Sequence, residues 1–336
     1  MSESGEGSEL TIWTGATRAA MTGRVLDLLG SAVRPIGVGG PRCAEVDRLA
    51  ADLDCPCEDD LRKLLIDRPS AMVFVSTAGR ISDDDMAVAL GQGSTLLLIE
   101  PVAADFDQLA SRSDLVAQTV SHGRTTLPIV RIPRFTAGIG WRSAADPAEA
   151  LGRVRSMAMT SVGRADEASL FARLFDAWST ILTRADLPNQ IDASLTGPLA
   201  DVPDDPHAMT GCLTAHGRLA DGRGVVVQVS DLAGHTAARL QAVGEHAVLE
   251  VTDLGYSLHD LEGALIDKHA TDRWEADFTQ MVADQWQQAI ERPAAAGPDL
   301  FSAHAQTLAC CLACLLSSRT GEAESPAKLL GLHSAG

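Results

Sequence analysis

Two segments of the chain place polar side chains where a ligand could bind. Thr77 ends an apolar run that begins at Ala71, and Glu100 follows a second apolar run, 94–99. Both runs have the length and composition of strands that are buried on both faces of a parallel sheet. In such sheets ligands bind beyond the carboxyl ends of the strands. The spacing therefore predicts that Thr77-Ala-Gly-Arg80 and Glu100-Pro-Val-Ala103 face one cleft.

A glycine-containing turn follows the first predicted strand, residues 10–13. Laid on the pattern G-x-G-x-x-G, its three positions are held by Gly15, Thr17 and Ala20. Glycines at such positions let the backbone approach a pyrophosphate at the N-terminus of a helix. Alanine is tolerated at the third position, whereas Thr17 places a side chain where the phosphates would lie. The segment fits either a modified dinucleotide-binding turn or an ordinary strand–helix turn without function.

The end of the second predicted strand, residues 33–38, bears on the kind of cofactor. A site for NAD usually has a carboxylate here that accepts hydrogen bonds from the ribose, and in this chain that place is Gly40. Arg42 would suit the 2′-phosphate of NADP, or it is a solvated surface arginine, which is the more common case. We therefore expect NAD or NADP to bind at Gly40, Arg42, Thr77, Glu100 and Pro101, with no cofactor as the remaining possibility.

These residues need a doubly wound parallel sheet to position them. The helix between the two central strands begins at Ser82, whose hydroxyl can cap it, and Asp83 to Asp85 place negative charge at its N-terminus. Gly91 and Gly93 end it. Further helices are predicted at 43–53, 58–65 and 104–117, and a further strand at 127–132. We expect an α/β fold whose N-terminal Rossmann-type domain spans 10–133, after a flexible leader at 1–9.

The remainder of the chain predicts a different kind of sheet. From residue 154 to residue 251 short apolar stretches alternate with turns such as Asp221-Gly-Arg-Gly224, which is a strong hairpin signal. We expect a C-terminal α+β domain at 134–322 with a large open, mostly antiparallel sheet, closed by helices at 274–290 and 301–318. A polar tail follows at 323–336. The open sheet face needs cover, so we expect a homo-oligomer that pairs through this sheet.

The segment Leu98-Ile-Glu-Pro-Val-Ala103 carries a family resemblance. It resembles the segment Glu-Lys-Pro of the glucose–fructose oxidoreductase and inositol dehydrogenase (Gfo/Idh/MocA) family. Pro101 matches the family proline, so Ile99 stands where the family has glutamate and Glu100 where it has its catalytic lysine. Residues 150–156 are similar to the Ile-Gly-x-Val segment that opens the second sheet of the family. The resemblance implies hydride transfer between a nicotinamide and a sugar- or polyol-type hydroxy compound.

The family also carries the helix motif Asp-x-Gly-x-His-x-x-Asp, which residues 169–176 match only in part. Aligned on Asp176, the histidine place holds Arg173 and the first aspartate place holds Ser169. The resemblance thus sets Glu100 opposite Arg173, where a guanidinium lowers the pKa of a carboxyl group and cannot itself accept a proton. Losing acid–base assistance typically costs about 10²–10⁴ in rate. Activity is therefore left open: either an altered NAD(P)-dependent oxidoreductase, or a non-catalytic descendant that binds a ligand or a protein partner.

Composition excludes several other functions. The chain has 27 basic and 45 acidic side chains, a net charge of −18 that repels phosphate backbones, so we expect no nucleic-acid partner. There is neither an apolar run near the length of a membrane span nor a visible export signal, so we expect a cytoplasmic protein without a membrane partner. The histidines lack metal-ligand spacing, and we expect no metal site; a charged loop is favoured over a metal site for Asp267-Lys-His269 with Asp272. We expect Cys310, Cys311 and Cys314 to be core residues.

Overall fold

The computed structural model describes residues 7–77, 81–123, 128–198, 202–272, 278–291 and 300–334. The predicted leader up to residue 6, the residues Ala78-Gly-Arg80 of the predicted cleft, Trp274 and the last two residues lie outside this part of the chain. The chain divides into two compact units. The first comprises 1–103, 107–132 and 278–298, and the second comprises 104–106, 133–277 and 299–336. A single cut through the sequence therefore does not separate the units, because a late segment returns to the first.

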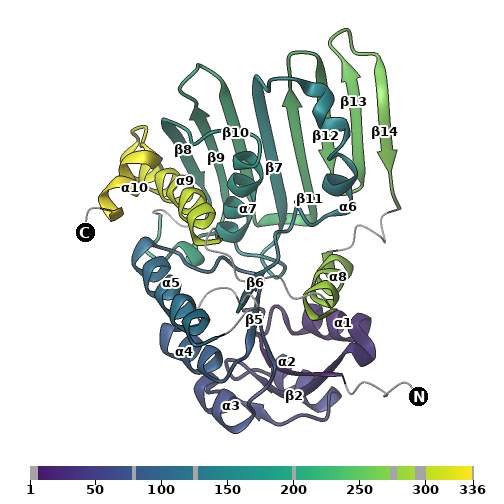
Figure 1. Ribbon diagram of the computed structural model, residues 1–336, viewed down its shortest axis with the longest axis vertical. Coiled ribbons are helices and arrows are strands. Elements are labelled where there is room, and N and C mark those ends of the chain that lie inside the picture. The colour runs from purple at the N-terminus through teal and green to yellow at the C-terminus, as the bar shows by residue number, and fades with distance from the viewer. Residues whose placement is uncertain are drawn as a thin grey trace. The chain divides into compact units, whose positions relative to one another are not determined.

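The first unit is built on a parallel sheet of six strands (Figure 1). The strands are β1 (Ser8–Trp13), β2 (Val33–Gly39), β3 (Cys57–Glu58), β4 (Met72–Val75), β5 (Thr95–Leu98) and β6 (Ile129–Arg131). Their order in the sheet is β3-β2-β1-β4-β5-β6. This is the doubly wound order, in which the direction of winding reverses between β1 and β4. The predicted Rossmann-type fold is confirmed.

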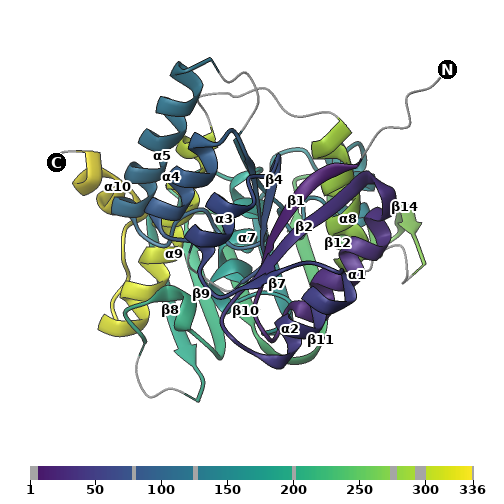
Figure 2. The same ribbon diagram turned by 90° about the horizontal axis from the view of Figure 1, so that it is seen from below.

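Helices cover both faces of this sheet. They are α1 (Ala19–Leu29), followed by the short 3-10 helix η1 (Gly30–Ala32), and α2 (Ala44–Asp52), α3 (Leu61–Asp67), α4 (Asp83–Gly91), α5 (Phe106–Ser121) and α8 (Phe278–Glu291). Figure 2 shows α1, α2 and α8 on one side of the strands and α3, α4 and α5 on the other. Helix α8 packs on α1 and buries Trp286 edge-on against Phe74, with ring centroids 3.9 Å apart. The returning segment thus completes the core of the first unit.

The sequence predicted the start of α4 correctly but placed the start of α3 too early. The Ser82 hydroxyl accepts a hydrogen bond from the backbone N–H of Asp85 at 3.1 Å, so the predicted cap is confirmed. Gly93 follows the end of α4 with φ 84°, a conformation that glycine adopts readily. The predicted helix at 58–65 is wrong at its start, because Cys57 and Glu58 pair with β2 as strand β3 and Asp60 caps α3. A strand of two residues leaves no periodic pattern in a sequence.

The second unit contains an eight-stranded sheet. Its strands are β7 (Ser156–Arg164), β8 (Gln190–Thr196), β9 (Cys212–Arg218), β10 (Gly224–Ser230), β11 (Leu232–Val243), β12 (Ala247–Thr252), β13 (Gly255–Asp260) and β14 (Leu265–Ala270). The order is β14-β13-β12-β11-β7-β10-β9-β8, and among these pairs β7 and β10 are parallel while the others are antiparallel. The predicted mostly antiparallel sheet is confirmed, and β9 and β10 form the predicted hairpin. Strand β14, which contains Asp267-Lys-His269, was predicted as a loop, and all its residues are exposed.

The second unit also contains helices. They are α6 (Ile139–Ser143), α7 (Leu170–Leu182), α9 (Leu300–Thr320) and α10 (Pro326–Ser334), with the 3-10 helices η2 (Pro147–Leu151) and η3 (Pro206–Ala208). Helix α10 packs on α9 and occupies much of the segment predicted as a polar tail. Within the described chain, α9 has the length and apolar composition of a membrane span, but it packs against β8 and α7 as a core helix does.

The cysteines of α9 lie in that core. Cys310, Cys311 and Cys314 are completely buried, which confirms the prediction. The indole N–H of Trp178 donates to the Cys314 sulfur at 3.2 Å. Burial raises the pKa of the Cys314 thiol to about 12. The thiol therefore stays protonated at neutral pH, and it serves packing rather than chemistry.

Candidate functional site

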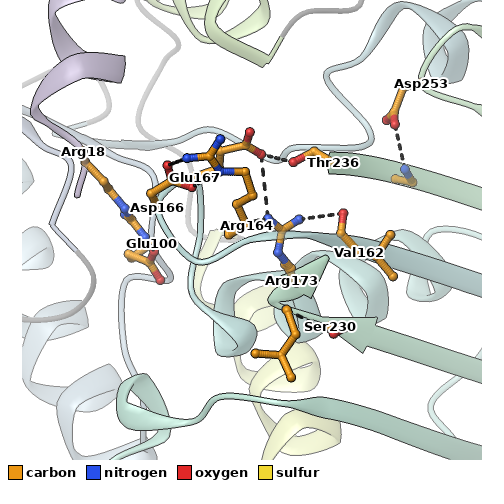
Figure 3. A network of polar contacts seen from close by, with 12 residues as sticks. Arg18, Glu100, Val162, Arg164, Asp166, Glu167, Arg173, Ser230, Thr236 and Asp253 are labelled. Atoms are coloured by element: carbon orange, nitrogen blue, oxygen red, sulfur yellow. Dashed lines mark hydrogen bonds and ion pairs between the residues drawn. The ribbon is translucent and has the colours of Figure 1, made fainter. Parts of the chain in front are cut away.

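A buried ion pair lies at the carboxyl ends of the central strands of the first unit. Arg18 comes from the turn before α1, and its guanidinium donates to a carboxylate oxygen of Glu100, which follows β5 (Figure 3). A second nitrogen of the guanidinium donates to the carbonyl of Ser76, which follows β4. The two charged side chains are 1% and 8% exposed. One arginine thus joins the turn before α1 to the ends of two neighbouring strands.

A cluster of three hydroxyl groups fixes the same turn. The Ser76 hydroxyl donates to the Thr14 hydroxyl at 2.7 Å, and the Thr22 hydroxyl lies 3.1 Å from Ser76 and 3.3 Å from Thr14. All three residues are fully buried. Thr14 follows β1 and Thr22 lies in α1, so this cluster joins β1, β4 and the first turn of the helix. Buried hydroxyl groups that satisfy one another rigidify the backbone that carries them.

The turn itself has the form of a strand–helix connection. The carbonyl of Gly15 accepts from the backbone N–H groups of Arg18 and Ala19, each at 3.0 Å. A Cβ atom added to Gly15 would meet only the Thr77 methyl group, at 3.7 Å, which is an ordinary contact. Thr17 and Ala20 are exposed. The side chain of this turn that reaches the ends of β4 and β5 is that of Arg18. That the exposed Thr17 side chain lies where phosphates would bind stays a prediction.

Gly40 and Arg42 lie at the end of β2. A Cβ atom at Gly40 would lie 1.8 Å from the carbonyl oxygen of Thr14, so the backbones approach too closely for any side chain. Glycine is required here by packing, and a ribose-binding carboxylate cannot occupy this position. Arg42 is 86% exposed and forms an ion pair with Asp59. Its side chain has the surface placement that we considered as the alternative to a phosphate-binding role.

The other predicted residues of this edge are buried to different degrees. Pro101 is buried beside Glu100, and Thr77 is half-buried. Within the described part of the chain the Thr77 hydroxyl oxygen has no hydrogen-bond partner although water does not reach it. Nearby, Arg112 of α5 donates to the carbonyl of Ile81 at 2.7 Å and to Asp83 at 2.8 Å, and also to the carbonyl of Val102. The segment after β5 is therefore held in place by a buried arginine.

In the second unit Arg173 of α7 lies against the end of β7. It is 1% exposed and donates to the carbonyls of Val162 at 3.2 Å and Arg164 at 2.9 Å (Figure 3). The carboxylate of Glu167 lies 3.8 Å from the guanidinium and accepts from the Thr236 hydroxyl. The Arg173 side chain therefore stabilises the end of β7 through hydrogen bonds to backbone carbonyls, and its predicted place in the active site stays a prediction.

Two further carboxylates belong to this polar region of the second unit. Asp176, also on α7, is buried and accepts from the backbone N–H of Arg134 at 3.3 Å. Asp253, after β12, accepts from the backbone N–H of Ala238 at 2.7 Å. Burial raises the pKa of Asp253, against the opposing effects of that hydrogen bond and of the charges of Arg134 and Arg173. No group of three or more metal-ligating side chains occurs in the described residues.

Sequence reasoning identified Glu100 and Arg173 as site residues but missed Arg18. The partners described above lie within the unit of each residue: Arg18 for Glu100, and backbone carbonyls with Glu167 for Arg173. That the two side chains face each other stays a prediction. In the sequence, Arg18 stands out only as a long cationic side chain in a turn of otherwise small residues. That feature does not predict which carboxylate the arginine binds.

Comparisons with known proteins yield structural matches alone. No family model matches the chain, and no curated protein matches it. Among solved structures, GenD2 from gentamicin A biosynthesis, in complex with NAD, has a TM-score of 0.69 at 16% identity, covering 96% of this chain and 97% of that one. Levoglucosan dehydrogenase, in complex with NADH and levoglucosan, has a TM-score of 0.68 at 10% identity, covering 94% and 99%.

A third match is a putative myo-inositol dehydrogenase from Sinorhizobium meliloti 1021. Its TM-score is 0.66 at 14% identity, covering 95% of this chain and 99% of that one. Identities this low show the fold and leave the activity of this chain undetermined. Over almost its whole length, this chain shares the fold of GenD2 and of levoglucosan dehydrogenase, which have been solved with NAD and with NADH.

Proposed function

We propose that this protein binds NAD or NADP at the carboxyl edge of its first sheet, and that the hydride transfer of sugar and polyol dehydrogenases is absent or severely slowed. Three features support nucleotide binding: the doubly wound strand order, the turn at the N-terminus of α1, and the fold shared with NAD-bound dehydrogenases. The observation that carries the loss of activity is the buried pair of Arg18 and Glu100.

The chemistry of that pair explains the proposed loss. Oxidation of a hydroxyl group needs a base that takes the hydroxyl proton as hydride leaves. A carboxylate bonded to a guanidinium is stabilised in its ionised form and is therefore a weak proton acceptor, and arginine stays protonated in proteins. Neither Arg18 nor Glu100 can thus replace the lysine that the family resemblance places at residue 100. We expect a rate reduced by about 10²–10⁴, the usual contribution of acid–base catalysis.

The test compares cofactor binding with turnover. We expect wild-type protein to quench or enhance NADH or NADPH fluorescence on binding, and to oxidise myo-inositol and levoglucosan at the background rate. The variants Glu100→Lys/Arg18→Met and Glu100→Lys/Arg173→His restore an amine at residue 100, and Arg18→Met alone is the control without an amine. A gain in turnover of about 10² or more in either amine variant would support the proposal. Brisk polyol oxidation by the wild type would contradict it.

The second candidate function is a non-catalytic protein that binds another ligand or a protein partner and no nucleotide. It is favoured by the way Arg18 fills the ends of β4 and β5, where a nucleotide would need hydrogen-bond acceptors. The same titration separates the two candidates. Absence of any fluorescence change with NADH and NADPH, in wild type and variants alike, would support the second candidate.

We also propose that the protein forms a homodimer through the sheet of the second unit. Helices α6, α7 and α9 pack on this sheet through its buried residues, and the alternate residues of its strands, such as Thr160, Val226 and Gln228, are half-buried or exposed. A second copy would cover this face. We expect light scattering to give about twice the chain mass of 35.3 kDa, and Val226→Glu to give one chain mass. A monomeric wild type at micromolar concentration would contradict the dimer.

A further inference from the structure

We infer that two copies of this chain meet along an apolar stripe at one end of the second sheet, and that Lys268 of each copy forms an ion pair with Glu262 of the other. The stripe consists of Val243, Val248, His259 and Leu265. This contact rests on the homodimer proposed above, and it specifies the part of the sheet that is covered and the orientation of the two copies. It follows from the register of four neighbouring strands and from two exposed charges beside them.

Direct pairing across four strands places the stripe on one face of the sheet. Val243 of β11 lies opposite Val248 of β12. Val248 lies in turn opposite His259 of β13, and His259 lies opposite Leu265 of β14. Residues that are directly opposite each other in a sheet carry their side chains on the same face. Figure 1 shows β12, β13 and β14 side by side at one end of this sheet.

The stripe lies on the face that the core of the second unit leaves uncovered. Val248 is half-buried, whereas the next residue of β12, Leu249, is 3% exposed and belongs to the other face. Leu265 is 51% exposed, and the nearby Leu261 and Ile266 are 54% and 55% exposed. Exposed apolar side chains that lie together mark an interaction surface. The stripe therefore has the character of a contact that a partner buries.

Charges of opposite sign flank the stripe on its two sides. Lys268 lies opposite Ser257, which is two residues from His259 along β13. Glu262 lies in the turn between β13 and β14, beyond the other side of the stripe. Both charged side chains are exposed, and neither forms an ion pair within the described part of the chain. The surface thus carries a cation on one side of its apolar centre and a carboxylate on the other.

This arrangement of charge is complementary to itself. A twofold dimer brings the same surface of both copies together. If the twofold axis runs along the stripe and across the strands, the Lys268 side of one copy lies over the Glu262 side of the other, and the ion pair forms twice. An axis parallel to the strands would instead bring the two Lys268 sides together. A surface that supplies its own counter-charge fits a second copy of the chain.

The same axis accounts for the rest of the sheet. Because it crosses the strands, it lays each strand over its own counterpart, β10 included. Val226 of β10 is two residues from Gly224 and belongs to the same uncovered face. The variant Val226→Glu, proposed above as a test of the homodimer, would therefore place a charge in the same contact. An apolar centre with a charged rim is the usual composition of a protein interface.

Analytical ultracentrifugation of the full-length chain measures the dissociation constant of the dimer. We expect Leu265→Lys to raise this constant at least about tenfold, because it would bury a charge in the stripe. Leu332→Lys is the matched control. Leu332 is 75% exposed and lies on α10, outside the sheet, so the same substitution should leave the constant within about threefold of the wild type. Circular dichroism checks that each variant is folded.

Charge reversal tests the orientation of the two copies. Lys268→Glu and Glu262→Lys each bring like charges together twice, and we expect each to raise the dissociation constant about tenfold. Lys268→Glu/Glu262→Lys restores opposite charges in both pairs, and we expect its constant to lie within about threefold of the wild type. Lys328→Glu, at an exposed lysine of α10, is the control for the change in net charge.

The outcomes separate this contact from the homodimer itself. A monomeric wild type at micromolar concentration would overturn both. A dimeric wild type whose dissociation constant is unchanged by Leu265→Lys would overturn the stripe as the contact and leave the homodimer standing. A double charge variant that dimerises no better than either single variant would show that the two copies meet in another orientation, and would also overturn the proposed contact.

Discussion

Replacing Arg18 by methionine is expected to lower the free energy of unfolding by about 3–5 kcal/mol, because it breaks the buried ion pair with Glu100 by removing one partner. Methionine keeps much of the length of the side chain, so the loss reports mainly on charge and hydrogen bonding. The Ser76 carbonyl would lose a donor at the same time. Urea unfolding followed by circular dichroism measures the change, as a shift of the midpoint at constant slope.

Two further variants distinguish this effect from a general loss of packing. Arg18→Met/Glu100→Met removes both charges of the pair, and we expect it to recover most of the lost stability, since an apolar pair of similar volume often replaces a buried ion pair without cost. Arg42→Met breaks the ion pair with Asp59, whose partners are 86% and 41% exposed, and should change stability by less than about 1 kcal/mol. Equal losses in the free energy of unfolding for Arg18→Met and Arg42→Met would show that the buried Arg18–Glu100 pair stabilises the protein no more than an exposed ion pair does.

Sequence patterns predicted the fold well because its elements depend on local signals. Residues 72–75 and 96–99 are apolar throughout, as doubly covered strands must be, and Ser82 with the following aspartates marks a helix start. The hairpin between β9 and β10 was predicted from Asp221 and Gly222, and Gly222 has φ 84°. Strands β3 and β14 were missed because one has two residues and the other is exposed on both faces, so neither shows an alternating pattern.

The site was predicted less completely because its contacts are distant in sequence. Arg18 and Glu100 are separated by 82 positions, and nothing near Arg18 indicates that its side chain turns inward. Arg173 is bonded to backbone carbonyls, which every residue possesses, so no partner type could be read from the sequence. The pattern G-x-G-x-x-G located the turn at Gly15. Arg18, whose guanidinium bonds to Ser76 and Glu100, lies between two positions of that pattern.

Replacing Gly40 by alanine is expected to lower the free energy of unfolding by about 1–3 kcal/mol, and Gly40→Asp by at least as much. The added Cβ atom would lie 1.8 Å from the Thr14 carbonyl oxygen, so the backbone must move. This backbone is tied on both sides, since the N–H of Thr14 donates to the carbonyl of Gly39 at 2.9 Å and the N–H of Gly40 donates to the carbonyl of Glu58 at 3.1 Å. The measurement is again urea unfolding.

Gly15→Ala is the matched control, because its Cβ atom would have only the ordinary contact of 3.7 Å with Thr77 and should change stability by no more than about 0.5 kcal/mol. If Gly40→Asp were as stable as Gly15→Ala, the close approach of the two turns would not be what requires glycine. It would then be possible to restore a ribose-binding carboxylate at the end of β2. If Gly40→Asp is destabilised as expected, any carboxylate that binds the ribose has to come from another segment, and the partly exposed Asp59 after β3 is one candidate.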